Sequence, residues 1–341
     1  MNGFMELAKG GKYHQLSQSI LSAAPEMSLE ELSSVYSSVV VPNHYNLDAD
    51  SFAEIVSAIA KRTPPKEALV VLEKALNLLT ALYTDVDASL APIPRAIALA
   101  RDRPAVAKLL LDIAHQHIVL GDIPSARIIL YDCKNIQMEG KDILRRFHLT
   151  MGLLHYVTKN YSPAFKNLLE CLEISAPEPE TFTTCLVSGI LSDRVYSFAR
   201  LISLWKGGEM PALALARALE EGDTDRSNSV ALTIDETLGP IVQRKALIIK
   251  LLNCFFSNPQ RSTSLPELAE SLSMPLPVLE QTILDILGSG LMKGTIDGIT
   301  GLFTYTWIGY KHLTPTETQS VRSIISQLRE RVLQVTREVS K

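Results

Sequence analysis

Leu291-Met-Lys-Gly-Thr-Ile-Asp-Gly-Ile-Thr-Gly-Leu-Phe-Thr-Tyr-Thr-Trp-Ile308 is the stretch that decides the fold. It holds two short runs with strand-forming residues, 291–296 and 302–308, on either side of a turn. Gly298 and Gly301 supply the conformational freedom that the turn needs. The stretch therefore predicts a β-hairpin.

Three helical patterns precede this hairpin, at Ile241–Phe256, Ser264–Leu272 and Pro277–Leu287. Three helices followed by a hairpin is the order of a winged helix, so residues 241–313 are predicted to form one. A third helix that reads duplex DNA needs basic or amide side chains on its outer face. This one has no basic residue and carries Glu280 and Asp285, so duplex binding is disfavoured.

The second strand of the hairpin carries an aromatic row, Phe303, Tyr305 and Trp307, which alternation predicts to lie on one face. Such a row could stack nucleic-acid bases or pack on the helices of its own domain, and packing is favoured. The strand is also predicted to be an open sheet edge that offers backbone groups to a neighbouring subunit.

After the hairpin, Thr316–Lys341 carries the sharpest pattern in the chain. Apolar residues recur at alternating spacings of four and three, as in the seam of a coiled coil or helix bundle. This helix could dock on its own domain or meet helices of other chains, and the second is favoured. Residues 314–341 are thus predicted to be an assembly helix, with a seam formed by Val321, Ile325, Leu328, Val332, Val335 and Val339.

Before residue 241 nearly all apolar segments have helical spacing, and two neighbouring helix pairs look like copies of one unit. A shift of 38 residues superposes Asp122 on Asn160 and Ala126 on Ala164. Residues 1–240 are therefore predicted to be a helical-repeat domain. The predicted helices are Phe4–Leu21, Leu29–Val40, Ser51–Lys61, Pro65–Tyr83, Val106–Leu120, Ser125–Ile136, Ile143–Thr158, Pro163–Leu172 and Phe182–Leu191.

Composition narrows the classes of function. The net charge of −4 arises from 33 basic and 37 acidic residues that are well mixed, which removes a broad attraction to nucleic acid. The first residues do not form a secretory signal, and the most apolar stretch, Ala246–Phe256, is too short to span a bilayer. The four cysteines form no Cys-x-x-Cys pair, so buried free thiols and a reducing compartment, cytosol or nucleus, are expected.

One motif partly matches a known zinc-binding pattern: His115-Gln-His117, followed by Ser125. Zinc isopeptidases of the MPN type use this pattern with an aspartate three residues after the serine, where this chain has Ile128. His148 and His155 share a helix face but have no third ligand in the pattern. We therefore expect no catalytic residue, no metal and no cofactor.

Five segments of the C-terminal part carry a resemblance to a known family: Gln243-Arg-Lys-Ala-Leu-Ile-Ile-Lys-Leu-Leu252, Leu265-Pro-Glu-Leu-Ala269, Val278-Leu-Glu280, Gly290-Leu-Met-Lys-Gly-Thr-Ile-Asp297 and Thr306-Trp307. A weaker echo lies at Gly189–Leu201. These motifs resemble those of the PCI family, whose members serve the proteasome lid, the COP9 signalosome and translation initiation factor three. The resemblance covers roughly the last 150 residues.

The resemblance implies a non-catalytic scaffold, with closest similarity to a lid subunit of the proteasome regulatory particle. Its partners would be other PCI and MPN subunits, held through the winged-helix edge and the terminal helix, with no nucleic acid and no membrane. Two alternatives remain open: a PCI subunit of one of the other two complexes, and a winged-helix adaptor that binds nucleic acid, with Lys293 in its wing.

Overall fold

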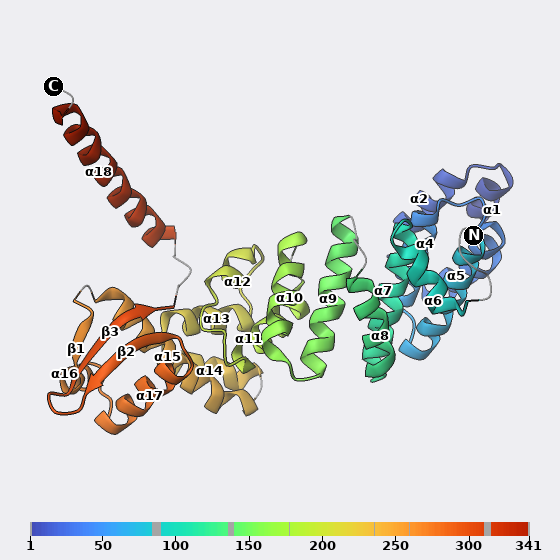
Figure 1. The fold of residues 1–341 in the computed structure, drawn as a ribbon. Helices are drawn as coiled ribbons and strands as arrows, with labels where there is room; N and C mark the ends of the chain where they lie inside the picture. The colour runs from blue at the N-terminus through green and yellow to red at the C-terminus, as the bar shows by residue number, and fades with distance from the viewer. Residues whose placement is uncertain are drawn as a thin grey trace. The chain divides into compact units, whose positions relative to one another are not determined.

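The computed structural model describes residues 2–83, 90–135, 140–176, 178–234, 236–258, 260–309 and 315–339 (Figure 1). These residues are mostly helical, which confirms the predicted helical fold class. The chain divides into two compact units, Met1–Thr181 and Phe182–Lys341. The domain boundaries predicted from the sequence, at residues 240 and 313, are not tested by this division into units and stay predictions.

Unit 1 is a succession of helices in which neighbours along the chain pack together. Its apolar core runs without interruption from Leu16 in the second helix to Leu154 in α9. The elements are α1 (Asn2–Lys9), α2 (Tyr13–Ala23), α3 (Leu29–Val35), the π-helix η1 (Tyr36–Val40), the 3-10 helix η2 (Val41–Asn43), α4 (Ala49–Ala60), α5 (Pro65–Ala81), α6 (Pro92–Ala100), α7 (Pro104–Val119), α8 (Ile123–Lys134), α9 (Lys141–Val157) and α10 (Tyr161–Ile174).

The two helix pairs α7–α8 and α9–α10 repeat the same turn 38 residues apart. Gly121 and Lys159 take left-handed backbone conformations, with φ of 81° and 60°. The next amide donates a hydrogen bond of 2.8 Å, from Asp122 to the His117 carbonyl and from Asn160 to the His155 carbonyl. This bond closes a helix end in the Schellman manner, so the predicted repeat is confirmed at the level of backbone bonds.

Small residues at one place in each repeat let the paired helices approach. Ala126 and Ala164 are both fully buried. In the second pair, a Cβ added to Gly152 of α9 would lie 2.6 Å from Leu168 Cγ of α10. The same turn recurs in unit 2, where Gly222 has φ of 75° and the next amide donates to the Ala218 carbonyl at 3.0 Å.

Two helix predictions need correction. Phe4–Leu21 is not one helix, because Gly11 adopts φ of 68° and ends α1 before α2 begins. A residue in the left-handed region stops an α-helix, and glycine enters it at no steric cost. Helix α6 and the helices Ala199–Leu204, Pro211–Glu221 and Thr224–Ile234 were not among the predicted helices. Helix α6 holds two prolines, both in its first turn, where the lost N–H has no helical partner.

Unit 2 combines helices with a small sheet. Helices α13 and α14 pack against α15, which leads into the predicted hairpin module. The elements are α11 (Pro179–Leu191, beginning at the end of unit 1), α12 (Ala199–Leu204), α13 (Pro211–Glu221), α14 (Thr224–Ile234), η3 (Glu236–Leu238), α15 (Gly239–Ser257), β1 (Ser262–Ser264), α16 (Leu265–Ser271), α17 (Leu276–Gly288), β2 (Met292–Asp297), β3 (Leu302–Ile308) and α18 (Pro315–Val339).

The sheet is antiparallel with strand order β1-β3-β2. The predicted hairpin is confirmed as β2 and β3, and β1 was not foreseen. The side chain of Phe303 is fully buried and meets Phe255 of α15 with ring centroids 5.3 Å apart. The hydroxyl of buried Tyr305 donates to the Phe255 carbonyl at 2.7 Å, so the sheet is fastened to α15 by packing and by hydrogen bonding.

Among the described residues, none of the helices has both the length and the apolar character needed to cross a bilayer.

Candidate partner-binding surfaces

The predicted seam of α18 is uncovered in this chain. Its described side chains have exposed fractions between 40% and 60%, which are large for aliphatic residues. Contiguous exposed apolar surface of this kind marks interaction sites. The exposed members are Val321, Ile325, Leu328, Val332 and Val335, whereas the side chain of Val339 lies outside the described residues.

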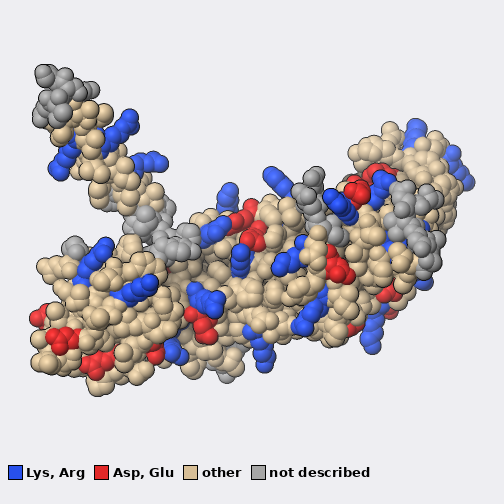
Figure 2. Space-filling model, viewed as in Figure 1, with Lys and Arg blue, Asp and Glu red and all other residues tan. Residues whose placement is uncertain are grey.

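Two apolar side chains beside this seam were missed by the sequence analysis. Ile324 is 61% exposed and Leu333 is 45% exposed. Neither falls on the spacing of four and three that drew attention to the seam, so periodicity could not find them. They widen the apolar face beyond a strict two-helix stripe, as in helices that enter a bundle. Basic side chains stand out beside this face along α18 in Figure 2.

The aromatic row of β3 does not lie on one face, contrary to the sequence prediction. Phe303 and Tyr305 are buried in the core of unit 2, whereas Trp307 is 46% exposed. The pairing register shifts between Lys293 and Gly294, which is a β-bulge that reverses the inward and outward alternation beyond it. Trp307 therefore points outward, with the Lys293 ammonium 5.8 Å from its ring centroid.

The predicted open edge is also misplaced. β3 is the central strand, because β1 pairs with it on one side and β2 on the other. The outer strands are β1 and β2, so backbone groups for a neighbouring strand would come from Met292–Asp297 or Ser262–Ser264. The three polar residues of β1 carry no alternating pattern, so the strand could not be predicted from the residue pattern.

This topology predicts that Thr304→Pro destabilises the module itself. Thr304 pairs with Ser262 on one side and Thr295 on the other. Proline removes a donor from inside the ladder, and an unpaired buried group costs about 1–3 kcal/mol. Thermal melts of the isolated chain should show a clear loss for Thr304→Pro and a small one for Thr304→Ala. Equal melting temperatures for the two variants would indicate instead that β3 is an edge strand.

Lys245 joins two of the motifs that carry the family resemblance. Its ammonium, on α15, donates to the carbonyls of Gly189 at 2.7 Å and Ser192 at 2.5 Å, which end α11. It also lies 4.9 Å from the ring centroid of Tyr196. N–H donors satisfy the free carbonyls at a helix end, and the Lys245 side chain supplies two of them whether it is charged or neutral. The side chain is a structural fastening between α11 and α15.

Burial lowers the pKa of Lys245 to about 7. Because the ordinary value is 10.5, the unfolded chain holds one more proton at this site between these pH values. The free energy of unfolding should therefore rise with pH above 7, by up to about 1.4 kcal/mol per pH unit. Denaturation between pH 7 and 9 should show this slope in the wild type and a smaller slope in Lys245→Met. Equal slopes would contradict the assignment.

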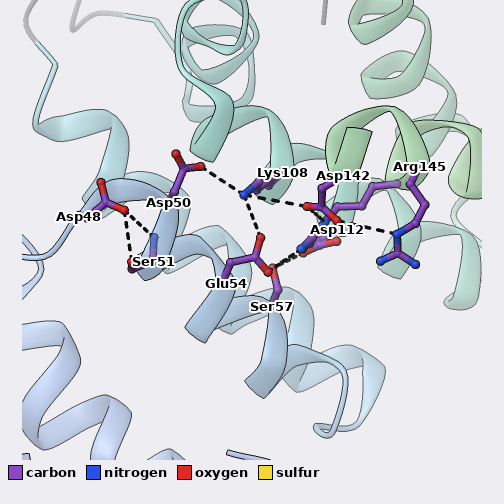
Figure 3. Close-up of polar contacts among 10 residues, drawn as sticks. Asp48, Asp50, Ser51, Glu54, Ser57, Lys108, Asp112, Asp142 and Arg145 are labelled. Atoms are coloured by element: carbon purple, nitrogen blue, oxygen red, sulfur yellow. Dashed lines mark hydrogen bonds and ion pairs between the residues drawn. The ribbon is translucent and has the colours of Figure 1, made fainter. Parts of the chain in front are cut away.

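An ion network centred on the buried Arg146 side chain joins three helices of unit 1 (Figure 3). The Arg146 guanidinium on α9 is 6% exposed. It donates to Asp142 at 3.0 Å, to Asp112 of α7 at 2.7 Å and to Glu54 of α4 at 2.8 Å. It also donates to the Ser57 hydroxyl at 3.0 Å, and that hydroxyl donates in turn to Asp112. We call these residues, with Lys108 and Asp50, the Arg146 network.

Lys108 completes this network at its outer side. Its ammonium lies 2.9 Å from a Glu54 oxygen and 3.2 Å from an Asp50 oxygen. Burial would lower the pKa of Lys108, but the hydrogen bond to Glu54 and the charges of Glu54 and Asp50 outweigh burial and raise it. The pKa of Arg146 is raised in the same way by Asp112, Glu54 and Asp142. Both cations thus stay charged and serve as structural partners.

The His115-Gln-His117 motif does not form a metal site in the described structure. Burial lowers the pKa of His115, whereas His117 Nδ1 lies 3.1 Å from Asp122, at the turn into α8. Ile128, which replaces the motif's aspartate, is 62% exposed. Within the described ranges, three metal-ligating side chains do not converge anywhere.

The four cysteines that the sequence analysis considered lie where a structural role, and not a reactive one, is expected. All four cysteines are free thiols, as predicted; Cys133, Cys171 and Cys185 are buried and Cys254 is half-buried. Burial raises the pKa of Cys133 to about 12, which keeps it unreactive.

Acidic charge on the outer side of α17 is partly neutralised by α15. Asp285 accepts a hydrogen bond of 2.8 Å from Arg244, while Glu280 is exposed. Helix α17 has no basic residue. Weak binding of duplex DNA therefore stays a prediction.

These features define a helical protein built of repeated helix pairs, a helix-and-sheet module and an exposed amphipathic helix. No protein-family model matches the chain. The chain is 24% identical over 232 residues to the 26S proteasome regulatory subunit RPN9 of Saccharomyces cerevisiae, with 59% of this chain and 58% of the yeast protein covered. The similarity thus spans somewhat more than half of each protein.

Proposed function

We propose that this chain is a non-catalytic scaffold subunit of the lid of the proteasome regulatory particle, where it organises partner subunits for ubiquitin-dependent protein degradation. The observation that carries the proposal is the similarity to the yeast regulatory subunit RPN9 over 59% of this chain. Within the lid, the proposed counterpart is proteasome non-ATPase regulatory subunit 13. Such a subunit works in the cytosol and nucleus.

The hairpin module is proposed to be the winged helix of a PCI domain. Its element order, α15-β1-α16-α17-β2-β3, with sheet order β1-β3-β2, supports this assignment. The family-like motifs fall on these elements: Gln243–Leu252 on α15, Leu265–Ala269 on α16, and Gly290–Asp297 leading into and forming β2. The fastening through Lys245 adds the echo at Gly189–Leu201 to the same domain.

Two features of the module suit a scaffold. The exposed seam of α18 offers an apolar face to helices of partner subunits, and the outer strand β2 offers backbone groups to a neighbouring sheet. The proposed partners are other PCI and MPN subunits, and hydrolysis of ubiquitin linkages would belong to a partner with a complete zinc motif. The Arg146 network and the hydrogen bonds of Lys245 would stabilise the fold of the scaffold.

Affinity purification of the tagged full chain from its own cells tests this proposal. Mass spectrometry of the co-purifying proteins should identify subunits of the proteasome regulatory particle in comparable amounts. Recovery of COP9 signalosome or initiation factor three subunits instead would move the chain to another PCI complex. Recovery of nucleic acid without either set of subunits would favour the adaptor.

A further inference from the structure

The turn between β2 and β3 presents an isoleucine to solvent. The side chain of Ile299 is 97% exposed, so it takes almost no part in the packing of its own chain. Leu302, three residues later, is 40% exposed, and exposed Pro266 of α16 contacts the backbone of the turn at Gly301. Tight turns ordinarily present Gly, Asn, Asp or Ser at such positions. We call Ile299, Leu302 and Pro266 the turn tip.

The turn is held in one conformation. Asp297 accepts hydrogen bonds from the Thr300 hydroxyl at 2.6 Å and the Ile299 amide at 2.9 Å, and these bonds lower the pKa of its carboxyl. Gly301 takes φ of 66°, and its carbonyl accepts a bond of 2.9 Å from the Leu265 amide, which ties the turn to α16. Because the turn is already formed, binding through Ile299 orders little additional chain, and this favours affinity.

The surface around the turn tip is acidic. Residues 262–302 contain five acidic residues and one basic residue. One of the five, Asp285, is bonded to Arg244 of α15. Glu267 and Glu270 are exposed on α16, the helix that the turn contacts. Figure 2 shows acidic side chains grouped on the part of unit 2 where Figure 1 places α16.

The basic side chains of the sheet lie at its opposite end. Lys293 pairs with Trp307 near the start of β2, whereas the turn follows the end of that strand. The Arg261 guanidinium donates to the Thr306 carbonyl at 3.2 Å, at the same end of the sheet as Lys293. Charge is therefore separated along the strands, and the turn tip has an acidic rim.

We propose that the turn tip inserts into an apolar pocket of a different chain and that basic side chains surround this pocket. An apolar centre with a polar rim is the usual anatomy of a protein interface, and complementary charge selects the partner. A second copy of this chain that met the first through the same surface would set one acidic rim against the other. The inference rests on the proposed function, which places the partner in the regulatory particle, and adds a contact apart from the α18 seam and the outer strands.

The contact is measured by titrating the labelled full chain with regulatory particle purified from cells depleted of this chain. Ile299→Ser removes the aliphatic anchor and should weaken binding by about 10- to 100-fold. Ile299→Val keeps a branched aliphatic side chain and should lose less than about fivefold. Neither change should alter the melting temperature, since Ile299 packs on nothing in the free chain. The matched control is Ile128→Ser, at a 62% exposed isoleucine of α8, which should bind as tightly as the wild type.

The acidic rim is tested by Glu267→Gln combined with Glu270→Gln. Loss of two exposed ion pairs should weaken binding by about 2- to 30-fold at low salt. This loss should shrink as the ionic strength rises, because the charges are exposed to solvent. Glu67→Gln with Glu73→Gln removes the same charge from exposed positions of α5 and should change neither the affinity nor its salt dependence.

Equal affinity of Ile299→Ser and the wild type would overturn the inference and leave the proposed function in place. Wild-type affinity of the Glu267 and Glu270 variant at low salt would overturn it as well, because the pocket would then have no basic rim. A dimer of the full chain that Ile299→Ser dissociates would assign the pocket to a second copy, against the inference. Failure of the wild-type chain itself to bind the depleted particle would contradict the proposed function and the inference together.

Discussion

Leu328→Glu combined with Val332→Glu is expected to keep the chain out of the proposed lid complex while the melting temperature of the chain itself stays unchanged. Each aliphatic side chain of the seam gains roughly 1.5–3 kcal/mol on full burial. Association and ordering cost about 4–15 kcal/mol, so a useful affinity needs a nearly complete seam. Two charges in its middle remove the two most central contacts and place carboxylates in an apolar interface. Both residues are more than half exposed in the chain itself, so its own fold has little to lose.

The measurement is incorporation of the tagged variant into the assembled particle, followed by co-purification. Gln327→Glu with Gln334→Glu is the matched control, because it adds the same charge off the seam and should assemble normally. Normal assembly of the seam variant would remove α18 from the partner-binding surfaces. A large drop in the melting temperature of the isolated seam variant would show instead that α18 packs on its own unit.

Arg146→Met should destabilise unit 1 by about 1–3 kcal/mol, because Asp112, the least exposed of its three carboxylate partners, is left without its main donor, whereas water can reach Glu54 and Asp142. Methionine retains most of the buried volume but donates no hydrogen bond. Asp112, Glu54 and Asp142 then lose the guanidinium to which all three are bonded. Urea denaturation followed by circular dichroism should show an early transition for the variant.

Arg145→Met provides the control for this experiment. Arg145 is the neighbouring arginine and removes the same charge, but its nearest carboxylate oxygens lie at 3.6 and 3.8 Å, from Glu178 and Asp142. Its loss should shift the midpoint little. Similar midpoints for the two variants would mean that net charge, and not the network, determines the stability of unit 1.

Helix positions were largely predictable from the sequence because burial repeats with the helical period. Leu72, Leu76 and Leu79 recur at helical spacing in the predicted helix Pro65–Tyr83, and all three are buried in α5, while Leu69, one turn earlier, is half-buried. The 38-residue repeat was also visible, since Ala126 and Ala164 are small for the same packing reason. The break at Gly11 was not predicted, because the helical spacing of apolar residues continues across Gly11 whereas the helical backbone ends there.

The candidate surfaces were predictable only in part. The seam of α18 follows from periodicity, yet its exposure in the chain is a property of the folded structure. The outward turn of Trp307 depends on a bulge, which inserts one residue into the ladder without any mark in the residue pattern. The edge was misassigned for a similar reason, because β1 is too short and too polar to show a strand pattern.

The Arg146 network could not be predicted from the pattern of residues in the sequence. Its members on α4, α7 and α9 are ordinary charged residues of helical segments, and nothing local distinguishes Arg146 from Arg145. Only the packing of the three helices turns one arginine inward. Lys245 was closer to reach, since a lysine on the apolar side of a helix signals a buried partner, and here the partners are backbone carbonyls.

The order of synthesis gives the Arg146 network a further consequence. Glu54 leaves the ribosome 92 residues ahead of Arg146. At about 5–20 residues per second, this is a delay of roughly 5–20 s. Asp112 follows Glu54 along the chain and precedes Arg146 by 34 residues. For roughly 2–7 s, therefore, close packing of α4 on α7 would bring Glu54 and Asp112 together without the guanidinium that bridges them. The nascent helices before α9 should therefore stay loosely associated and open to chaperones, and unit 1 should close only when α9 has emerged.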